Sequence, residues 1–296
     1  KSTRNPYYDY KKIFSTLDDK EKRDGLILGE ELVKKRVVGD VNSGIEYLSK
    51  SPFAKSSNPN SNLFNKDSFQ VLLALHNFFD NPHKYRSFYY DDYMDWALNT
   101  LDILSKKNIN IYLKWHPISF KYSSDVHAKK IISNKIKNLK NVKIIFDELN
   151  YTDLINNGLS WAITAHGTVA NELPFSGVKV MNCGDNPHIN YNFSITPKSK
   201  EEYESNLNNI KNLDYQIDRK EIYEFYYMNY VYFNQKNFSH KISDKDYVHE
   251  KETRLDVDLN NSSEFFKFAS SKILNEKIVS KTENYINEFL VKGDLG

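Results

Sequence analysis

The chain has 296 residues, and its 41 lysines and arginines nearly cancel its 39 aspartates and glutamates, leaving a formal net charge of +2. This length can bury a full core, as one large domain or two small ones, and the balanced charge argues against a general nucleic-acid-binding protein. No apolar run approaches the roughly 18 residues that a membrane-spanning helix needs.

The single cysteine, Cys183, allows no internal disulfide, which suits a reducing compartment. No signal peptide is recognisable at the start of the sequence. We therefore expect a soluble, cytoplasmic protein with at most peripheral contact at the inner face of the cytoplasmic membrane. Because the sequence starts at Lys1 without a methionine, a processed or trimmed piece of a longer chain is also expected.

The first part of the chain, residues 1–67, shows no clear hydrophobic period. The spacing favours a helix at 28–37 and another at 43–48, and the polar string at 58–62 predicts a loop. We interpret residues 1–67 as an N-terminal cap or the remnant of an acceptor domain.

From residue 69 onward, short apolar runs alternate with amphipathic stretches. The amphipathic stretches predict helices at 91–107, 123–139, 151–156 and 199–212, and a further helix that carries Glu172 and ends at Gly177. Pro174 is expected to shorten or kink that helix. The apolar runs predict strands at 70–75, 110–115, 142–146, 161–165 and 178–183.

Such alternation is typical of a parallel sheet with helices on both faces. The predicted fold class is therefore α/β, with a Rossmann-like nucleotide-binding domain over residues 68–215 and additional helices at both ends. Residues 216–296 form the predicted C-terminal helical segment. Within it, the aromatic stretch 221–233 is expected to be a buried helix rather than a surface on which sugars stack, and 263–291 returns to helical spacing.

Histidines follow the predicted strands, at the point where each strand ends. They are His76 and His83 after the first strand, His116 after the second, His166 after the fourth and His188 after the fifth. In a parallel sheet these loops share one edge, where ligands bind. Histidine can donate a hydrogen bond to phosphate and can take up a proton near neutral pH. The sequence thus predicts an anion or nucleotide site at this edge.

Other polar residues in the same loops add to this prediction, and each also has a structural interpretation. Thr168 caps the following helix or binds phosphate, and Lys114 is an exposed strand residue or a phosphate partner. Glu172 is a solvated helix residue or binds a ribose hydroxyl. Asp80 and Asp185 stabilise turns or take part in the site.

Several familiar signatures are missing from the sequence. No glycine-rich dinucleotide motif follows a strand, and no Walker-type lysine loop is present. Zinc-binding spacings and the nucleophile elbow of serine hydrolases are missing too. We therefore expect neither a metal nor a cofactor.

Two short motifs carry a family resemblance. The first is KWHP at residues 114–117, and the second is TAHGTV at 164–169, with Glu172 and the closing FSGVKV at 175–180. They resemble capsular polysaccharide biosynthesis transferases, and are similar to the nucleotide-binding half of bacterial sialyltransferases and Kdo-transferring capsule enzymes. The resemblance covers residues 69–215. It implies the C-terminal type of domain of a GT-B glycosyltransferase and donors activated mostly by cytidine nucleotides.

The resemblance also implies roles for individual residues. His116, next to Pro117, contacts the donor phosphate, and Gly167 and Thr168 present a helix start to that phosphate, beside His166. Glu172 holds the ribose or base. Lys114, Asp185 and His188 complete the expected nucleotide-binding set, while Asp80, His83 or His76 is the candidate catalytic base, unless the base belongs to sequence outside this chain.

The predicted function is inverting, metal-independent transfer of a sugar from a CMP- or CDP-linked donor, in capsular polysaccharide synthesis. The expected partners are that donor, an oligosaccharide or glycolipid acceptor and capsule-assembly proteins, without nucleic acid. One alternative is a CDP-polyol phosphotransferase, which would move a phosphate with the transferred group. Others are a non-catalytic nucleotide-sugar-binding module and, as a weaker option, an epimerase-like enzyme.

Overall fold

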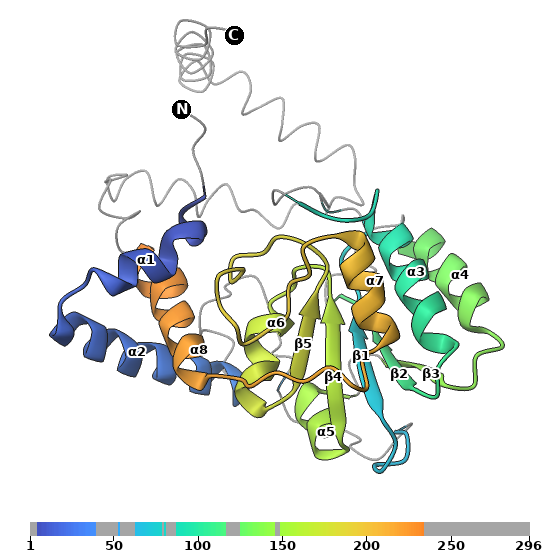
Figure 1. Ribbon diagram of the computed structural model, residues 1–296. Helices are drawn as coiled ribbons and strands as arrows, with labels where there is room; N and C mark the ends of the chain where they lie inside the picture. The colour runs from blue at the N-terminus through green and yellow to red at the C-terminus, as the bar shows by residue number, and fades with distance from the viewer. Residues whose placement is uncertain are drawn as a thin grey trace, which may run out of the picture. The chain divides into compact units, whose positions relative to one another are not determined.

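Five parallel strands form the centre of the computed structural model shown in Figure 1. Their order across the sheet is β3-β2-β1-β4-β5, and each neighbouring pair is parallel. The order in which the strands are added across the sheet therefore reverses between β1 and β4, as it does in dinucleotide-binding folds. The predicted Rossmann-like parallel sheet is confirmed; the strands are β1 (Gln70–Ala74), β2 (Asn110–Lys114), β3 (Val142–Ile145), β4 (Leu159–Thr164) and β5 (Lys179–Asn182).

The structure describes residues 5–39, 53, 63–78, 80, 87–116, 125–145 and 149–233. All of them belong to one compact unit, residues 1–237. None of the described helices is long and apolar enough to cross a membrane.

Helices cover both faces of the sheet. Side chains alternate along each strand, so each strand contributes apolar residues to both faces. Val71 and Leu73 of β1 point to the face covered by α3 (Tyr93–Ser105), α4 (Asp125–Ile136) and α7 (Lys200–Asn208). Leu72 and Ala74 point to the opposite face, covered by α5 (Tyr151–Asn156) and α6 (Val169–Glu172). Both faces of β1 are therefore buried, which explains its apolar run from Val71 to Ala74.

A third apolar cluster lies beside this sandwich and joins the two ends of the compact unit (Figure 1). The short helices Pro6–Asp9 (η1) and α1 (Tyr10–Ser15) lead into α2 (Asp19–Val37), which packs along α8 (Arg219–Tyr226). Asp18 begins α2 by accepting a hydrogen bond from the backbone N–H of Glu21 at 2.8 Å. A π-helical turn, Tyr227–Tyr232, continues α8.

The predicted elements agree with the structure where both can be compared. All five strands lie within two residues of their predicted ends, and the helix predicted at 28–37 is the second half of α2. The aromatic stretch 221–233 contributes buried side chains to the third cluster, as expected of core. Pro174 does end the helix: α6 stops at Glu172 and Leu173–Ser176 is a 3-10 turn. The predictions for 43–48, 58–62 and 263–291 fall outside the described residues.

Candidate functional site

A pocket of about 570 Å³, part of it open to solvent, lies where the strand order reverses. Residues that follow β1, β2 and β4 line it, together with the start of α5 and one side chain from α2. This is the edge at which open parallel sheets bind ligands. The lining residues are Arg36, Ala74, Leu75, His76, Lys114, Trp115, His116, Tyr151, Thr164, Gly167, Thr168, Val169 and Glu172.

The turn between β4 and α6 forms one wall of the pocket. The backbone N–H of Gly167 donates to the Thr164 hydroxyl at 3.1 Å, and a Cβ on Gly167 would lie only 2.8 Å from that oxygen. A side chain at Gly167 would therefore crowd Thr164 in this turn, and the N–H of Gly167 is already used within the turn. The N–H groups that follow, at Thr168 and Val169, begin the helix and have no preceding turn to bind.

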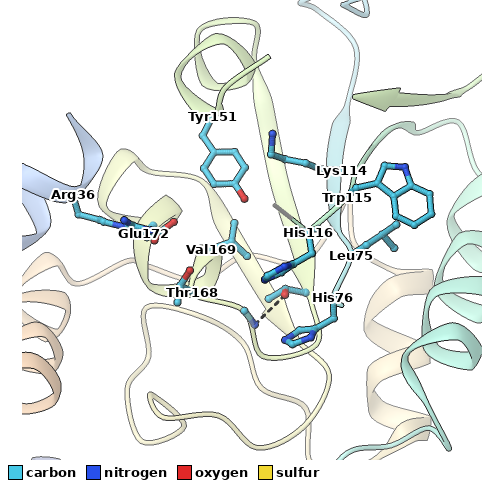
Figure 2. A pocket seen from close by; sticks show the side chains of 13 residues that line it. Arg36, Leu75, His76, Lys114, Trp115, His116, Tyr151, Thr168, Val169 and Glu172 are labelled. Carbon is cyan, nitrogen blue, oxygen red and sulfur yellow. Dashed lines mark hydrogen bonds and ion pairs between the residues drawn. The ribbon is translucent and has the colours of Figure 1, made fainter. Parts of the chain in front are cut away.

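Thr168 does not cap α6: its side chain makes no capping hydrogen bond, and its backbone is already helical. The predicted cap is therefore wrong. The hydroxyl instead belongs to the wall of the pocket (Figure 2).

Three of the predicted histidines meet at this edge of the sheet. The ring centroid of His76 lies 4.7 Å from that of His166 and 5.7 Å from that of His116. Tyr93 stacks on His76 at 4.3 Å, and its hydroxyl is 2.9 Å from Nε2 of His166. His76 and His116 line the pocket, whereas His166 is not among its lining residues.

Burial, together with the neighbouring His166 and His116, lowers the pKa of His76 to about 3. A histidine with such a pKa is neutral at physiological pH and a weak base. The structure therefore disfavours His76 as the catalytic base. A neutral ring can still donate or accept a hydrogen bond in the pocket. Among the described residues, no group of three His, Cys, Asp or Glu side chains is placed to bind a metal ion.

Lys114 occupies the side of the pocket opposite α6 (Figure 2). It is buried at the end of β2, and its ammonium donates to the carbonyl of Leu149 at 3.2 Å. The same ammonium lies 5.6 Å from the ring centre of Tyr151, at the start of α5. These contacts hold the ammonium of Lys114 at the wall of the pocket.

Arg36 and Glu172 form a buried ion pair at the other side of the pocket (Figure 2). Nε of Arg36 donates to Oε1 of Glu172 at 2.8 Å, and each residue is 1% exposed. Burial by itself lowers the pKa of Arg36, but the Glu172 carboxylate outweighs it and the net shift is upward. With two cations and one carboxylate, the described lining residues carry a charge of +1 when the histidines are neutral.

Two predicted site residues lie elsewhere. The buried carboxylate of Asp185 accepts a hydrogen bond from the hydroxyl of Tyr8. His188 is 1% exposed and packs in the third apolar cluster, with its ring stacked on Phe193 at 5.4 Å and edge-on to Phe225 at 5.5 Å. Neither lines the pocket, so the loop after β5 does not bring them to the site.

The candidate bases after β1 lie at or beyond the limit of the described residues. Asp80 is exposed, and its backbone N–H donates to the carbonyl of Asn77 at 3.1 Å. The negative charge of its carboxylate raises the pKa of His76, against the larger lowering by burial. It is not among the residues that line the pocket. His83 and Pro117 lie outside the described residues.

Among the lining residues that sequence reasoning missed, Arg36 and Tyr151 come from helices and not from the strand ends. Arg36 lies in the part of the chain that showed no apolar period. The buried residues of α2 are Gly25, Gly29, Val33 and Arg36, which occupy one helical face at spacings of four, four and three. Two glycines and an arginine do not form an apolar stripe, so only the repeated small residues marked this face.

Comparisons with known proteins give distant likenesses among solved structures alone. Neither the protein-family models nor the curated proteins compared with the sequence include a match. Among solved structures, the chain is similar to a protein of Thermosulfurimonas dismutans described as KpsC, beta Kdo 2,4 transferase, with 15% identity and a TM-score of 0.41. The match covers 74% of this chain and 61% of that chain, less than two thirds of its length. A likeness this distant carries no functional argument.

Proposed function

We propose that this chain is a glycosyltransferase of cell-surface polysaccharide synthesis that uses a nucleotide-activated sugar, with a CMP-linked donor favoured. The observation that carries the proposal is the pocket at the reversal of strand order, which joins Lys114 and His116 to the turn at Thr168. These are the positions at which the sequence resembles capsular polysaccharide transferases. A nucleotide fits this location because its phosphate can meet the positive charge while its ribose reaches Glu172.

In this reaction an acceptor hydroxyl attacks the anomeric carbon of the donor, and the bond from that carbon to the phosphate oxygen breaks. The phosphate leaves with the electron pair, so stabilising its negative charge lowers the barrier. Lys114, His116 and the start of α6 at Thr168 are placed to provide that stabilisation. Attack from the side opposite the phosphate would invert the anomeric centre, without help from a metal.

The proton of the acceptor hydroxyl has to go to a base. Because His76 has a pKa of about 3, we assign this role to Asp80 or His83 in the loop that follows β1. Replacing Asp80 with Asn and His83 with Gln, singly, tests the choice: the base is the residue whose loss lowers kcat while the donor affinity stays the same.

The proposal predicts nucleotide binding that depends on His116. A thermal-shift series with CMP, CDP, UDP, GDP and ADP measures it, since a ligand at 100 times its Kd stabilises the fold by about 2.7 kcal/mol. We expect stabilisation by the cytidine nucleotides and a Kd at least about tenfold higher in His116→Ala, the loss of one charge-assisted hydrogen bond. His127→Ala, an exposed histidine on α4, is the matched control. Unchanged nucleotide affinity in His116→Ala would contradict the proposal.

A second candidate is a nucleotide-sugar-binding module without catalysis. It is favoured by one observation: among the described residues that line the pocket, Glu172 is the single carboxylate, and it is paired with Arg36. The two candidates differ in turnover. Release of free CMP from a CMP-sugar in the presence of acceptor supports the transferase, whereas tight binding without release supports the module.

A further inference from the structure

Arg36 lines the pocket, and part of its guanidinium has no partner among the described residues. Its Nε is paired with Glu172, but Nη1 and Nη2 are buried and make no hydrogen bond to any residue that the structure describes. An arginine carries five N–H donors, of which four are on these two nitrogens. Leaving donors of a buried charged group unpaired is costly, so native proteins rarely keep them in that state.

The ion pair with Glu172 does not remove this cost. A buried pair is stabilising only when the remaining donors are also satisfied. Glu172 meets the side of the guanidinium through one oxygen, at 2.8 Å, and leaves the end formed by Nη1 and Nη2 available. Two parallel N–H donors in a plane match the two oxygens of a carboxylate or phosphate group.

We infer that Arg36 is a ligand-binding residue whose Nη1 and Nη2 bind an oxyanion group, a phosphate or a carboxylate, of the molecule held in this pocket. Glu172 then has two tasks, because it orients the guanidinium through Nε besides its proposed contact with ribose. The site would thereby have two separate cations, Arg36 on the α6 side and Lys114 on the other. The inference rests on the proposed function in taking the pocket as the donor site.

The test compares Glu172→Gln with the double variant Arg36→Met/Glu172→Gln, so that the ribose contact is altered equally in both and no buried carboxylate is left unpaired. Arg23→Met, an exposed arginine on the same helix, is the control. Binding of cytidine, CMP, a CMP-linked sugar acid and inorganic phosphate is measured by calorimetry, and far-ultraviolet circular dichroism checks that each variant is folded.

Two outcomes support the inference and identify the source of the anion. If Arg36 binds the nucleotide phosphate, its loss lowers the affinity for CMP at least about tenfold and leaves that for cytidine unchanged. If it binds a carboxylate of the sugar, CMP affinity stays the same and the affinity for the sugar acid falls by a similar factor. A residue with a merely structural role would not discriminate among these ligands.

Other outcomes overturn it, and they separate it from the proposed function. If the double variant and Glu172→Gln bind all four ligands equally, while nucleotides still bind, the guanidinium is structural and the proposed function stands. If no nucleotide binds even to the unmodified chain, the proposed function fails. The inference is then decided by inorganic phosphate: stabilisation that is lost with Arg36 supports it, and absence of stabilisation overturns it. A double variant that does not fold is replaced by Arg36→Lys, which keeps the charge but not the paired donors, with the same expected discrimination.

Discussion

The hydroxyls of Thr168 and Ser199 occupy the same position relative to a helix but make different contacts. Ser199 caps α7 by accepting a hydrogen bond from the backbone N–H of Glu202 at 3.2 Å. Thr168 stands at the N-cap of α6 without such a bond. Stability therefore depends on the Ser199 hydroxyl, whereas the Thr168 hydroxyl is available to a ligand.

Replacing each residue with alanine separates these two roles. We expect Ser199→Ala to lower the free energy of unfolding by about 1 kcal/mol, the usual loss of a helix cap. Thr168→Ala should change it by less than about 0.5 kcal/mol but weaken CMP binding. Urea denaturation and calorimetry measure the two quantities. An equal loss of stability in both variants would show that Thr168 has a structural role after all.

Individual site residues could be predicted from sequence when they followed an apolar strand. His76, Lys114, His116 and Thr168 stand at or just after strand ends, which converge in a parallel sheet, and these predicted residues do line the pocket, as does Glu172 in the helix that follows. His188 satisfied the same rule, but the chain after β5 turns into an aromatic cluster that encloses it. Arg36 comes from outside the sheet, so no pattern of strand ends could reveal it.

At the scale of the elements, the buried face of α2 carries two glycines, Gly25 and Gly29, which have no side chains. A Cβ on Gly29 would lie 1.9 Å from the backbone carbonyl oxygen of Tyr223 in α8, a distance that no rotation of a side chain can relieve. A Cβ on Gly25 would meet only the ring of Tyr227, at 2.7 Å. The two helices thus approach most closely at Gly29, and this approach sets the position of Arg36 two turns later.

Gly29→Ala should therefore move α2 away from α8. Overpacking of this kind costs about 1–3 kcal/mol, and here it exceeds the gain of up to about 1 kcal/mol that alanine brings to a helix interior. We expect a lower urea midpoint for Gly29→Ala, with a smaller loss for Gly25→Ala, where a ring can shift. A midpoint for Gly29→Ala at or above that of the unmodified chain would refute the close contact.

The elements themselves were largely predictable, but their arrangement was not. Apolar runs bounded by polar loops gave all five strands, since a parallel sheet buries both faces. The order β3-β2-β1-β4-β5 depends on contacts between residues far apart in sequence. The pairing of α2 with α8 depends on the fit of a glycine face against a backbone, which hydrophobic periodicity does not record.

At the scale of the whole molecule, three groups among the described residues, His76, His188 and Glu224, shift the response of stability to acid. Burial lowers the pKa of His188 to about 3, as it does for His76, so both stay neutral in the folded state. Burial raises the pKa of Glu224 to about 7, so it takes up a proton more readily when folded. Between pH 6.5 and 4.5 the unfolded chain binds two more protons on the histidines, and the folded chain binds one more on Glu224.

Unfolding in this range therefore takes up about one proton net, and stability falls as the pH falls, by about 1.4 kcal/mol per pH unit per proton. Glu224 has one carboxyl group, so its opposing effect is at most one proton. Glu224→Gln should steepen the loss toward two protons, and His188→Phe should flatten it. Urea denaturation from pH 7.5 to 4.5 measures these slopes. A slope that His188→Phe leaves unchanged would mean that the buried ring is protonated in the folded state.

The packing of α2 on α8 also affects the order in which the parts of the chain fold. Arg36 leaves the ribosome before its partner Glu172, which follows 136 residues later, and the helix against which α2 packs comes later still, at Arg219–Tyr226. The parallel sheet can form as soon as β5 has been synthesised. The glycine face of α2 stays uncovered until α8 has been synthesised as well. Because contacts so distant in sequence form slowly, the wall of the pocket that Arg36 and Glu172 form should be the last part of the described structure to mature in a newly made chain.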